Sequence, residues 1–132
     1  MRLIKERGII EREPLFLFML QKENRLLKEK EFQSVFQKGR GFYVKEIGAK
    51  CAPNGRDATR FGFSLSLKVS KKAVERNRVK RQLRAIVREA MPGIRGGYDC
   101  VFVVRPELRD LSFEEKKERV LAILKHLKLF KT

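Results

Sequence analysis

Residues 71–89 read KKAVERNRVKRQLRAIVRE, and the organisation of the whole chain can be worked out from this stretch. Its apolar residues recur at the spacing of one helical face, which predicts an amphipathic helix from about Lys72 to Ala90. On a helical wheel the core face gathers Val79, Leu83, Ile86, Val87 and Ala90. Glu75 and Glu89 fall outside the neighbouring basic side. That basic side therefore has no acidic partner within its own stripe.

The basic side of this helix has the residue types that bind phosphate. It gathers Arg76, Asn77, Lys80, Arg81, Arg84 and Arg88. Residues 68–88 carry half of the chain's net charge, whereas an ordinary solvated helix mixes both signs through i,i+4 pairs. Guanidinium groups bind phosphate oxygens in bidentate geometry, and an amide adds a neutral donor and acceptor. A membrane-surface helix would need a broad exposed apolar face, and a helix-turn-helix would need a second helix close by. The pattern therefore favours binding to a nucleic acid.

Composition agrees with a small basic domain that binds a polyanion. The 132 residues suffice for one domain, and 42% of them are hydrophobic, enough for a packed core. The formal net charge of +16 opposes compaction and typically finds a polyanionic partner. Cys51 and Cys100 form no CxxC motif, which predicts two buried thiols and a reducing, cytoplasmic location. The apolar run 14–20 is too short to span a bilayer and lacks signal-peptide features, so we expect no secretion and no membrane contact.

The first part of the chain predicts a short helix. Phe32, Val35 and Phe36 fall at i, i+3 and i+4, which places them on one helical stripe. The glycine-containing segment 39–41 ends this helix. Asn24 either caps the start of the helix or lies in a turn before it.

The middle of the chain predicts a sheet. Residues 41–52, GFYVKEIGAKCA, form a strand region that is either single or split in two. The turn residues at 53–55 predict a hairpin loop to the next strand. Residues 60–70 then alternate as a half-buried strand, whose buried face takes Phe61, Phe63, Leu65 and Leu67.

The chain after the basic helix predicts one more strand and one more helix. The apolar run YDCVFVVRP, from Tyr98, is typical of a central strand. SFEE, at residues 112–115, is a capping box that starts the last helix. The buried stripe of that helix is Val120, Ile123, Leu124 and Leu127. The order is α-β-β-(β)-α-β-α, a mixed α+β or α/β fold of the two-layer sandwich type.

The segment RNRVKRQLR, residues 76–84, closely resembles the signature of the bacterial ribonuclease P protein component. RLLKEKEFQSVFQKGR, residues 25–40, looks like the first helix of that family. FGFSLSLKVSKKAVERNR, residues 61–78, looks like its strand-to-helix crossover. The resemblance runs from about Met19 to the last helix. It implies one RNA-binding domain over residues 19–132, an α/β sandwich with a left-handed βαβ connection.

The resemblance also implies a function. The family binds a large catalytic RNA and, together with it, removes the 5′ leader of precursor tRNA, so this chain would be a subunit of an endoribonuclease. Hydrolysis would belong to the RNA and its Mg²⁺ ions, with no cofactor bound by the protein alone and no obligate protein partner. The RNA-binding residues implied by position are Lys68, Lys71, Lys72, Arg76, Asn77, Arg78, Lys80, Arg81, Arg84 and Arg88. Phe32 and Phe36 match aromatic residues of a leader-binding cleft, although their spacing alone favours core packing.

Two features depart from the family pattern. Leu67 stands where the family has the first of two lysines after the central strand, which leaves Lys68 alone. Residues 1–18 have no family counterpart and no clear period. We interpret them as a loosely packed or irregular extension, either specific to a lineage or the product of an upstream start codon, since Met19 stands where the family typically begins.

Two other functions compete with this interpretation: a non-catalytic RNA-binding protein of the ribosomal type, and a stand-alone metal-dependent nuclease. Asp57, Asp99 and Asp110 are scattered, and the glutamates show no pairing on one apolar face, so a two-metal site has no evident ligands. His126, the only histidine, lies off the buried stripe of the last helix. We therefore expect no catalytic residue in this chain.

Overall fold

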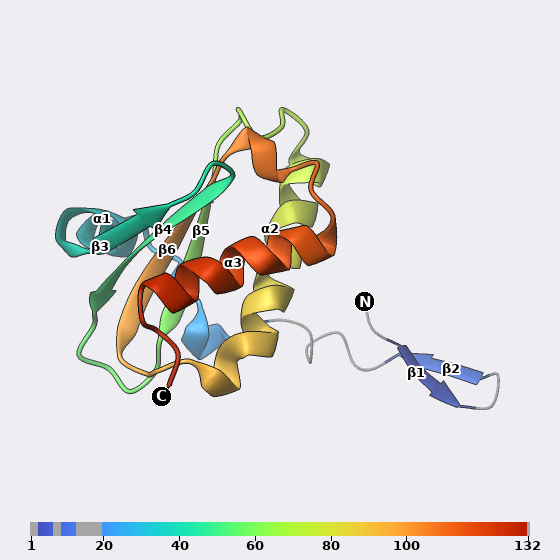
Figure 1. Cartoon of the computed structure of the whole chain (residues 1–132), viewed down its shortest axis with the longest axis horizontal. Coiled ribbons are helices and arrows are strands. Elements are labelled where there is room, and N and C mark those ends of the chain that lie inside the picture. The colour runs from blue at the N-terminus through green and yellow to red at the C-terminus, as the bar shows by residue number, and fades with distance from the viewer. Residues whose placement is uncertain (1–2, 7–8, 13–19, 132) are drawn as a thin grey trace.

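The structure of the protein is a computed structural model that describes residues 3–6, 9–12 and 20–131 (Figure 1). Its strands are β1 (Leu3–Glu6), β2 (Ile9–Arg12), β3 (Arg40–Tyr43), β4 (Ile47–Pro53), β5 (Arg60–Leu65) and β6 (Tyr98–Val104). Its α-helices are α1 (Glu29–Lys38), α2 (Ala73–Ala90) and α3 (Phe113–His126). Short 3-10 helices are η2 (Lys22–Asn24), η3 (Met91–Gly93) and η4 (Pro106–Leu108).

Strand β6 is the centre of a four-stranded sheet with the order β3-β4-β6-β5. It pairs antiparallel with β4 and parallel with β5, so both of its edges are used. A parallel pair needs a long crossover connection, and α2 supplies it between β5 and β6. The central strand predicted from the apolar run is confirmed. The strand region before it is split into the antiparallel pair β3 and β4.

The turn after β4 does not close a hairpin, so this expectation was wrong. β4 and β5 are not neighbours because β6 lies between them. Gly55, at φ 70°, lies in a loop that crosses the end of β6. Asn54 fixes this loop: its backbone N–H donates to the Gly97 carbonyl at 2.8 Å, and its amide donates to Asp99 Oδ1 at 2.8 Å. Turn residues show where the chain bends, but they do not show which strand becomes the neighbour.

Helices cover both faces of the sheet (Figure 1). α2 and α3 pack on one face, where Phe61, Phe102 and Leu124 belong to the main core. α1 packs on the opposite face, where Val35 and Val101 form the centre of a smaller apolar cluster. The mixed α+β class is confirmed, and α1 adds a layer to the two that were expected. The hand of the βαβ connection stays an expectation from the family resemblance.

The two long helices follow their sequence patterns closely. The buried residues of α2 are Val79, Leu83, Ile86 and Val87, while Ala90 is partly exposed. α3 begins at the predicted capping box, in which Ser112 Oγ accepts from the Glu115 N–H at 3.1 Å and the Glu115 carboxylate accepts from the Ser112 N–H at 2.9 Å. The predicted stripe of α3 is buried at Val120, Ile123, Leu124 and Leu127. Cys51 and Cys100 are buried thiols opposite each other on β4 and β6.

Three details differ from the sequence-based expectations or complete them. β5 ends at Leu65, so Leu67 lies in the following turn and is 66% exposed instead of buried. Asn24 lies in η2 before α1, and its amide donates to the Thr59 carbonyl at 2.8 Å. Within residues 1–18, where a loosely packed or irregular extension was expected, β1 and β2 pair antiparallel in a sheet of their own, and the loose packing stays a prediction. The rest of that segment lies outside the described residues.

We expect Leu83→Ala to destabilise the protein by roughly 2–5 kcal/mol, because it removes a fully buried side chain and leaves a cavity between α2 and the sheet. Arg81→Ala, on the exposed side of the same helix, is the matched control and should change the free energy of unfolding by well under that amount. Chemical denaturation measures both. Equal losses in the two variants would mean that the buried face of α2 is assigned incorrectly.

Candidate nucleic-acid interface

A row of four cations runs along α2 beside its buried face. Its members, spaced i,i+4, are Arg76, Lys80, Arg84 and Arg88, and all four are partly buried. Asn77 and Arg81 lie next to the row and are exposed. The structure therefore gathers six of the ten residues predicted to bind RNA on one side of a single rigid helix.

The pKa values of two members of the row are lowered, mainly by burial and further by neighbouring positive charges. Burial lowers the pKa of Lys80 from its ordinary value, and the charges of Arg84 and Arg76 lower it further. Burial also lowers the pKa of Arg84, with a second contribution from the charge of Arg25, which follows η2. Among the described residues no carboxylate pairs with this row. Within the part of the chain that the structure describes, the positive charges of the row are thus held together without a compensating carboxylate.

Three arginines at this surface also have one buried nitrogen atom each without a hydrogen-bond acceptor among the described residues. The Nε atoms of Arg25, Arg84 and Arg88 are buried and have no partner among the described residues. A buried donor that stays unpaired costs about 1–3 kcal/mol, and more when it is charged. Such groups call for an explanation, and an anionic partner with several oxygen acceptors provides one.

The remaining predicted cations do not join the row. Lys68, Lys71 and Lys72 are exposed in the turn before α2 and at its start. Arg78 lies on the other side of α2, toward α3, where its charge adds to burial in lowering the pKa of Lys116. The Lys116 ammonium donates to Gln82 Oε1 at 2.7 Å. Arg78 therefore faces a different surface from the row.

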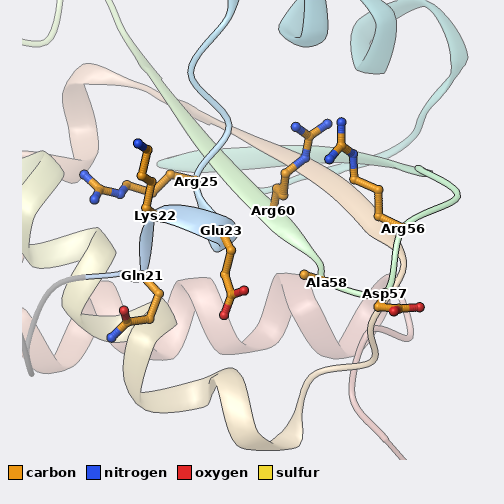
Figure 2. A pocket seen from close by; sticks show the side chains of 8 residues that line it. All are labelled: Gln21, Lys22, Glu23, Arg25, Arg56, Asp57, Ala58 and Arg60. Atoms are coloured by element: carbon orange, nitrogen blue, oxygen red, sulfur yellow. The ribbon is translucent and has the colours of Figure 1, made fainter.

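A hollow of about 740 Å³ opens beside η2 (Figure 2). Lys22 and Arg25 lie on one side of it and Arg56 and Arg60 on the other. The hollow is also lined by Gln21, Glu23, Asp57 and Ala58. Arg25 thus belongs to the wall of the hollow and also lies near Arg84 of the row. Sequence reasoning did not single out this place, because its cations come from three separate segments.

The predicted aromatic pair lies on the other face of the sheet. Phe32 and Phe36 are partly exposed and pack against the small cluster around Val35. The ring of Phe32 lies on Gly62, where a Cβ atom would come within 2.4 Å of the ring. The Lys50 ammonium donates to the Phe36 carbonyl at 2.9 Å. Half-buried rings beside a cation serve packing and remain partly accessible.

A third aromatic side chain lies on the same sheet face and was not predicted. Tyr43 pairs in register with Gly48, and a Cβ atom at Gly48 would overlap its ring. The ring is 40% exposed, and the Arg105 guanidinium carbon lies 5.6 Å from its centroid. β3 is only four residues long, too short for alternation to reveal which face Tyr43 takes.

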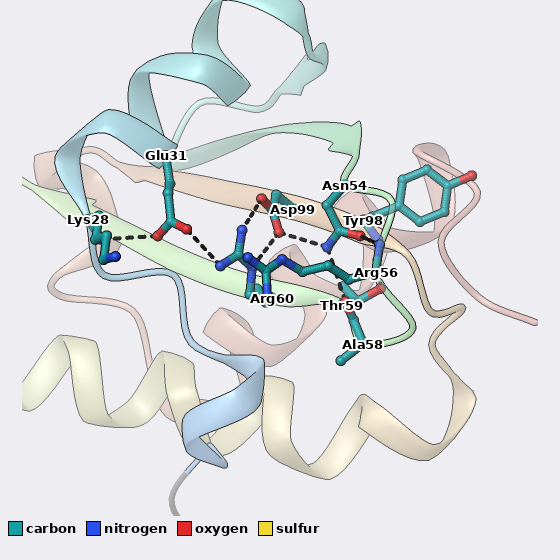
Figure 3. Close-up of polar contacts among 9 residues, drawn as sticks. All are labelled: Lys28, Glu31, Asn54, Arg56, Ala58, Thr59, Arg60, Tyr98 and Asp99. Atoms are coloured by element: carbon teal, nitrogen blue, oxygen red, sulfur yellow. Dashed lines mark hydrogen bonds and ion pairs between the residues drawn. The ribbon is translucent and has the colours of Figure 1, made fainter.

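An ion-pair network holds α1 against this face (Figure 3). The Arg60 guanidinium donates twice to the Asp99 carboxylate, with Nε–Oδ1 2.9 Å and Nη2–Oδ2 2.7 Å. Its remaining nitrogen, Nη1, donates to Glu31 Oε2 at 2.7 Å. Bidentate arginine–carboxylate pairs fix geometry as well as contributing energy. Because Glu31 precedes Phe32, the network also fixes the position of the aromatic pair.

Other candidate sites find little support among the described residues. No three His, Cys, Asp or Glu side chains in residues 3–6, 9–12 and 20–131 gather as a metal site. No helix in those ranges is long and apolar enough to cross a membrane. His126 is exposed, and its ring stacks on Phe42 with the centroids 3.6 Å apart.

Comparisons with known proteins agree on one family. A family model described as Ribonuclease P matches residues 20–128. The ribonuclease P protein component of Syntrophomonas wolfei is 38% identical over 112 residues, covering 85% of this chain and 93% of the relative. The ribonuclease P protein component of a Cyanothece species is 35% identical over 122 residues, covering 80% of this chain and 93% of the relative.

Solved structures show the same likeness. The RNase P protein of Staphylococcus aureus superposes with a TM-score of 0.76 at 26% identity, covering 82% of this chain and 98% of that chain. The RNase P protein of Thermotoga maritima gives a TM-score of 0.71 at 29% identity, covering 77% of this chain and 96% of that chain. The resemblance read from residues 76–84 is therefore confirmed over nearly the whole fold.

We expect Glu31→Gln to lower the melting temperature at pH 7 and to have little effect at pH 3. Burial acts to raise the pKa of Glu31, but hydrogen bonds from the Arg60 side chain and the Lys28 N–H outweigh it, and the folded pKa lies below the ordinary value of 4.5. A carboxylate with a lowered pKa stabilises the fold above its unfolded pKa, and this stabilisation disappears as the pH falls through the folded pKa.

Thermal unfolding of both proteins between pH 7 and pH 3 measures the effect. Glu29→Gln, an exposed change in the first turn of the same helix, is the control and should shift the melting temperature less. A Glu31→Gln deficit that stays constant down to pH 3 would contradict the role assigned to the ion pair.

Proposed function

The chain belongs to the ribonuclease P protein family, and from this premise we propose how its surfaces divide the RNA-binding work. As a family member it is a protein subunit of an endoribonuclease, and its partner is the ribonuclease P RNA. The row on α2 binds the backbone of that RNA. The opposite sheet face, with Phe32 and Phe36, binds the unpaired 5′ leader of precursor tRNA.

The observation that carries the first assignment is the uncompensated charge of the α2 row. Burial and the charges of Arg84 and Arg76 lower the pKa of Lys80, and the Nε atoms of Arg84 and Arg88 are buried without an acceptor among the described residues. A phosphate backbone supplies negative charge and acceptor oxygens together, and binding releases the counterions that surround the RNA. We therefore expect this surface to be stabilised more by contact with a polyanion than by contact with water.

The assignment of the leader rests on the partial exposure of the Phe32 and Phe36 side chains. Unpaired nucleotides bind by stacking on aromatic side chains next to cations, because every base has a flat apolar face. Phe32 and Phe36 are partly exposed on α1, and the Lys50 ammonium donates to the Phe36 carbonyl. We therefore assign leader bases to the rings and leader phosphates to Lys50.

The chemical step is assigned to the RNA and not to this chain. The family is consistent with an RNA-based holoenzyme, and we assign phosphodiester hydrolysis to that RNA and its Mg²⁺ ions. The described part of the chain has no cluster of three His, Cys, Asp or Glu side chains that could hold a metal ion. Its role is to bind and orient. The alternative of a ribosomal-type RNA-binding protein is not favoured by the comparisons.

We also propose that residues 19–132 form the functional domain and that it works in the cytoplasm. The family model begins at residue 20, and Leu20 is already part of the main core. Two free thiols facing each other across adjacent strands fit a reducing compartment.

We expect a chain that begins at Met19 to fold and to support leader removal as well as the full chain does. The main core described for residues 20–131 already includes Leu20, the first residue of that range. The measurements are thermal unfolding and the cleavage rate of precursor tRNA with the catalytic RNA. A loss of several kcal/mol of stability would show that the segment before Met19 is an integral part of the core.

We expect Lys80→Ala and Phe36→Ala to impair RNA binding in different ways. Affinity that comes from phosphate contacts falls with salt at a slope near −0.9 per neutralised phosphate on duplex and about −0.7 on single strands. Stacking depends much less on salt and contributes roughly 1–3 kcal/mol per base. Lys80→Ala should therefore flatten the salt dependence of binding to the catalytic RNA. Phe36→Ala should leave that slope unchanged.

The same two variants, assembled with the catalytic RNA, are then compared on precursor tRNA and on leaderless tRNA. Phe36→Ala should weaken binding of the precursor more than binding of the leaderless form. Unfolding is checked first, because Phe36 packs against the cluster around Val35. If a folded Phe36→Ala protein loses affinity for both substrates equally, the ring is a packing residue and the leader lies elsewhere.

A further inference from the structure

The hollow beside η2 is lined by more cationic than anionic side chains, even when Arg60 is left out because its guanidinium is already paired. Arg60 is fully engaged by Glu31 and Asp99. Lys22, Arg25 and Arg56 form no ion pair with any described residue, although Glu23 and Asp57 also line the hollow. The Nε atom of Arg25 is buried and has no acceptor among those residues. Arg25 therefore has no anionic partner among the described residues, and an external anion could supply one.

The walls of the hollow are held in place by backbone contacts. Arg25 forms a bridge to Phe61 of β5, and the next residue, Leu26, donates its N–H to the Phe61 carbonyl at 2.8 Å. On the other side, the Arg56 N–H donates to Asn54 Oδ1 at 2.7 Å, and the Asn54 amide donates to the Ala58 carbonyl at 3.0 Å. Both cation-bearing segments are therefore ordered before any ligand binds, which lowers the entropic cost of binding.

The hollow is also continuous with the row on α2. Arg25 lines the hollow, and its charge acts on Arg84 of the row. Arg25, Arg84 and Arg88 share the same defect, a buried Nε without an acceptor. An extended chain of regularly spaced negative charges would meet all three arginines and then reach the hollow. A strand of nucleic acid, with one phosphate per nucleotide, has this form.

We propose that the RNA-binding surface of α2 continues over Arg25 into this hollow, where Lys22, Arg25 and Arg56 bind phosphates of the ribonuclease P RNA. The inference rests on the proposed function of α2, because the same RNA strand is taken to cross both places. It adds a second contact region, built from η2 and the loop between β4 and β5. Neither segment was singled out by the RNRVKRQLR motif.

The test uses the full chain with Arg25→Met, Arg56→Ala and the double variant. Binding to the ribonuclease P RNA is measured over a series of salt concentrations. Each lost phosphate contact should reduce the slope of log affinity against log salt by about one. Lys125→Ala, which removes an exposed charge from the end of α3, is the matched control and should leave the slope unchanged.

The stability of the free protein separates a binding role from a structural one. Methionine keeps most of the length of Arg25 but removes its charge, which opposes Arg84. Arg25→Met should therefore keep or raise the melting temperature while it weakens RNA binding. A lowered melting temperature with an unchanged salt slope would overturn the proposal, because Arg25 would then be a structural residue.

Three further outcomes separate the hollow from the row on α2. If Lys80→Ala flattens the salt slope while the Arg25 and Arg56 variants do not, the α2 assignment stands and the hollow is not part of the interface. If the variants bind ribonuclease P RNA normally but the assembled holoenzyme loses affinity for precursor tRNA, the hollow serves the substrate and the proposal is overturned. If the Arg25 and Arg56 variants flatten the slope while Lys80→Ala does not, the hollow is supported and the α2 assignment fails.

Discussion

The double pairing of β6 is the constraint on which both proposed RNA-binding surfaces depend. β6 is parallel to β5, so the connection between them must cross a face of the sheet, and α2 makes that crossing. β6 is also buried on both sides, with Phe102 toward α2 and α3 and Val101 toward α1. The cationic helix and the aromatic pair are therefore carried on opposite faces of one sheet, with the apolar layers of that sheet between them.

The distribution of acidic side chains explains how a chain with a net charge of +16 keeps those surfaces positive. Asp99 and Glu31 both form ion pairs with Arg60, and Glu89 pairs with Lys117 of α3 at 3.0 Å. These carboxylates act where elements must be joined, and the row on α2 is left without them. Surface ion pairs contribute little stability each, so directing the few acids to structural joints leaves the cations available at small cost.

Local patterns predicted the elements well because helices and capping boxes are encoded within a few residues. The bounds of α2, the capping box at Ser112 and the central strand β6 all followed from such patterns. The neighbours of a strand are set by residues far away, which is why the turn at 53–55 looked like a hairpin. The hollow could not be predicted for the same reason. Lys22 and Arg25 are far from Arg56 in the sequence, and the bridge between Arg25 and Phe61 of β5 brings the two segments together.

The buried Nε atoms of Arg25, Arg84 and Arg88, which have no acceptor among the described residues, and the charge repulsion around Arg84 are costs that the free protein carries. Desolvation and mutual repulsion of Arg25, Arg84 and Lys80 oppose folding, as the lowered pKa values of Arg84 and Lys80 show. Rigid packing of Val79, Leu83 and Val87 holds α2 in place against this repulsion. A polyanion removes the repulsion and supplies the missing acceptors, so binding stabilises the fold as well as the complex. On the proposed assignment, RNA would thus supply the acceptors that this surface lacks among the described residues, while the apolar core stabilises the protein before RNA binds.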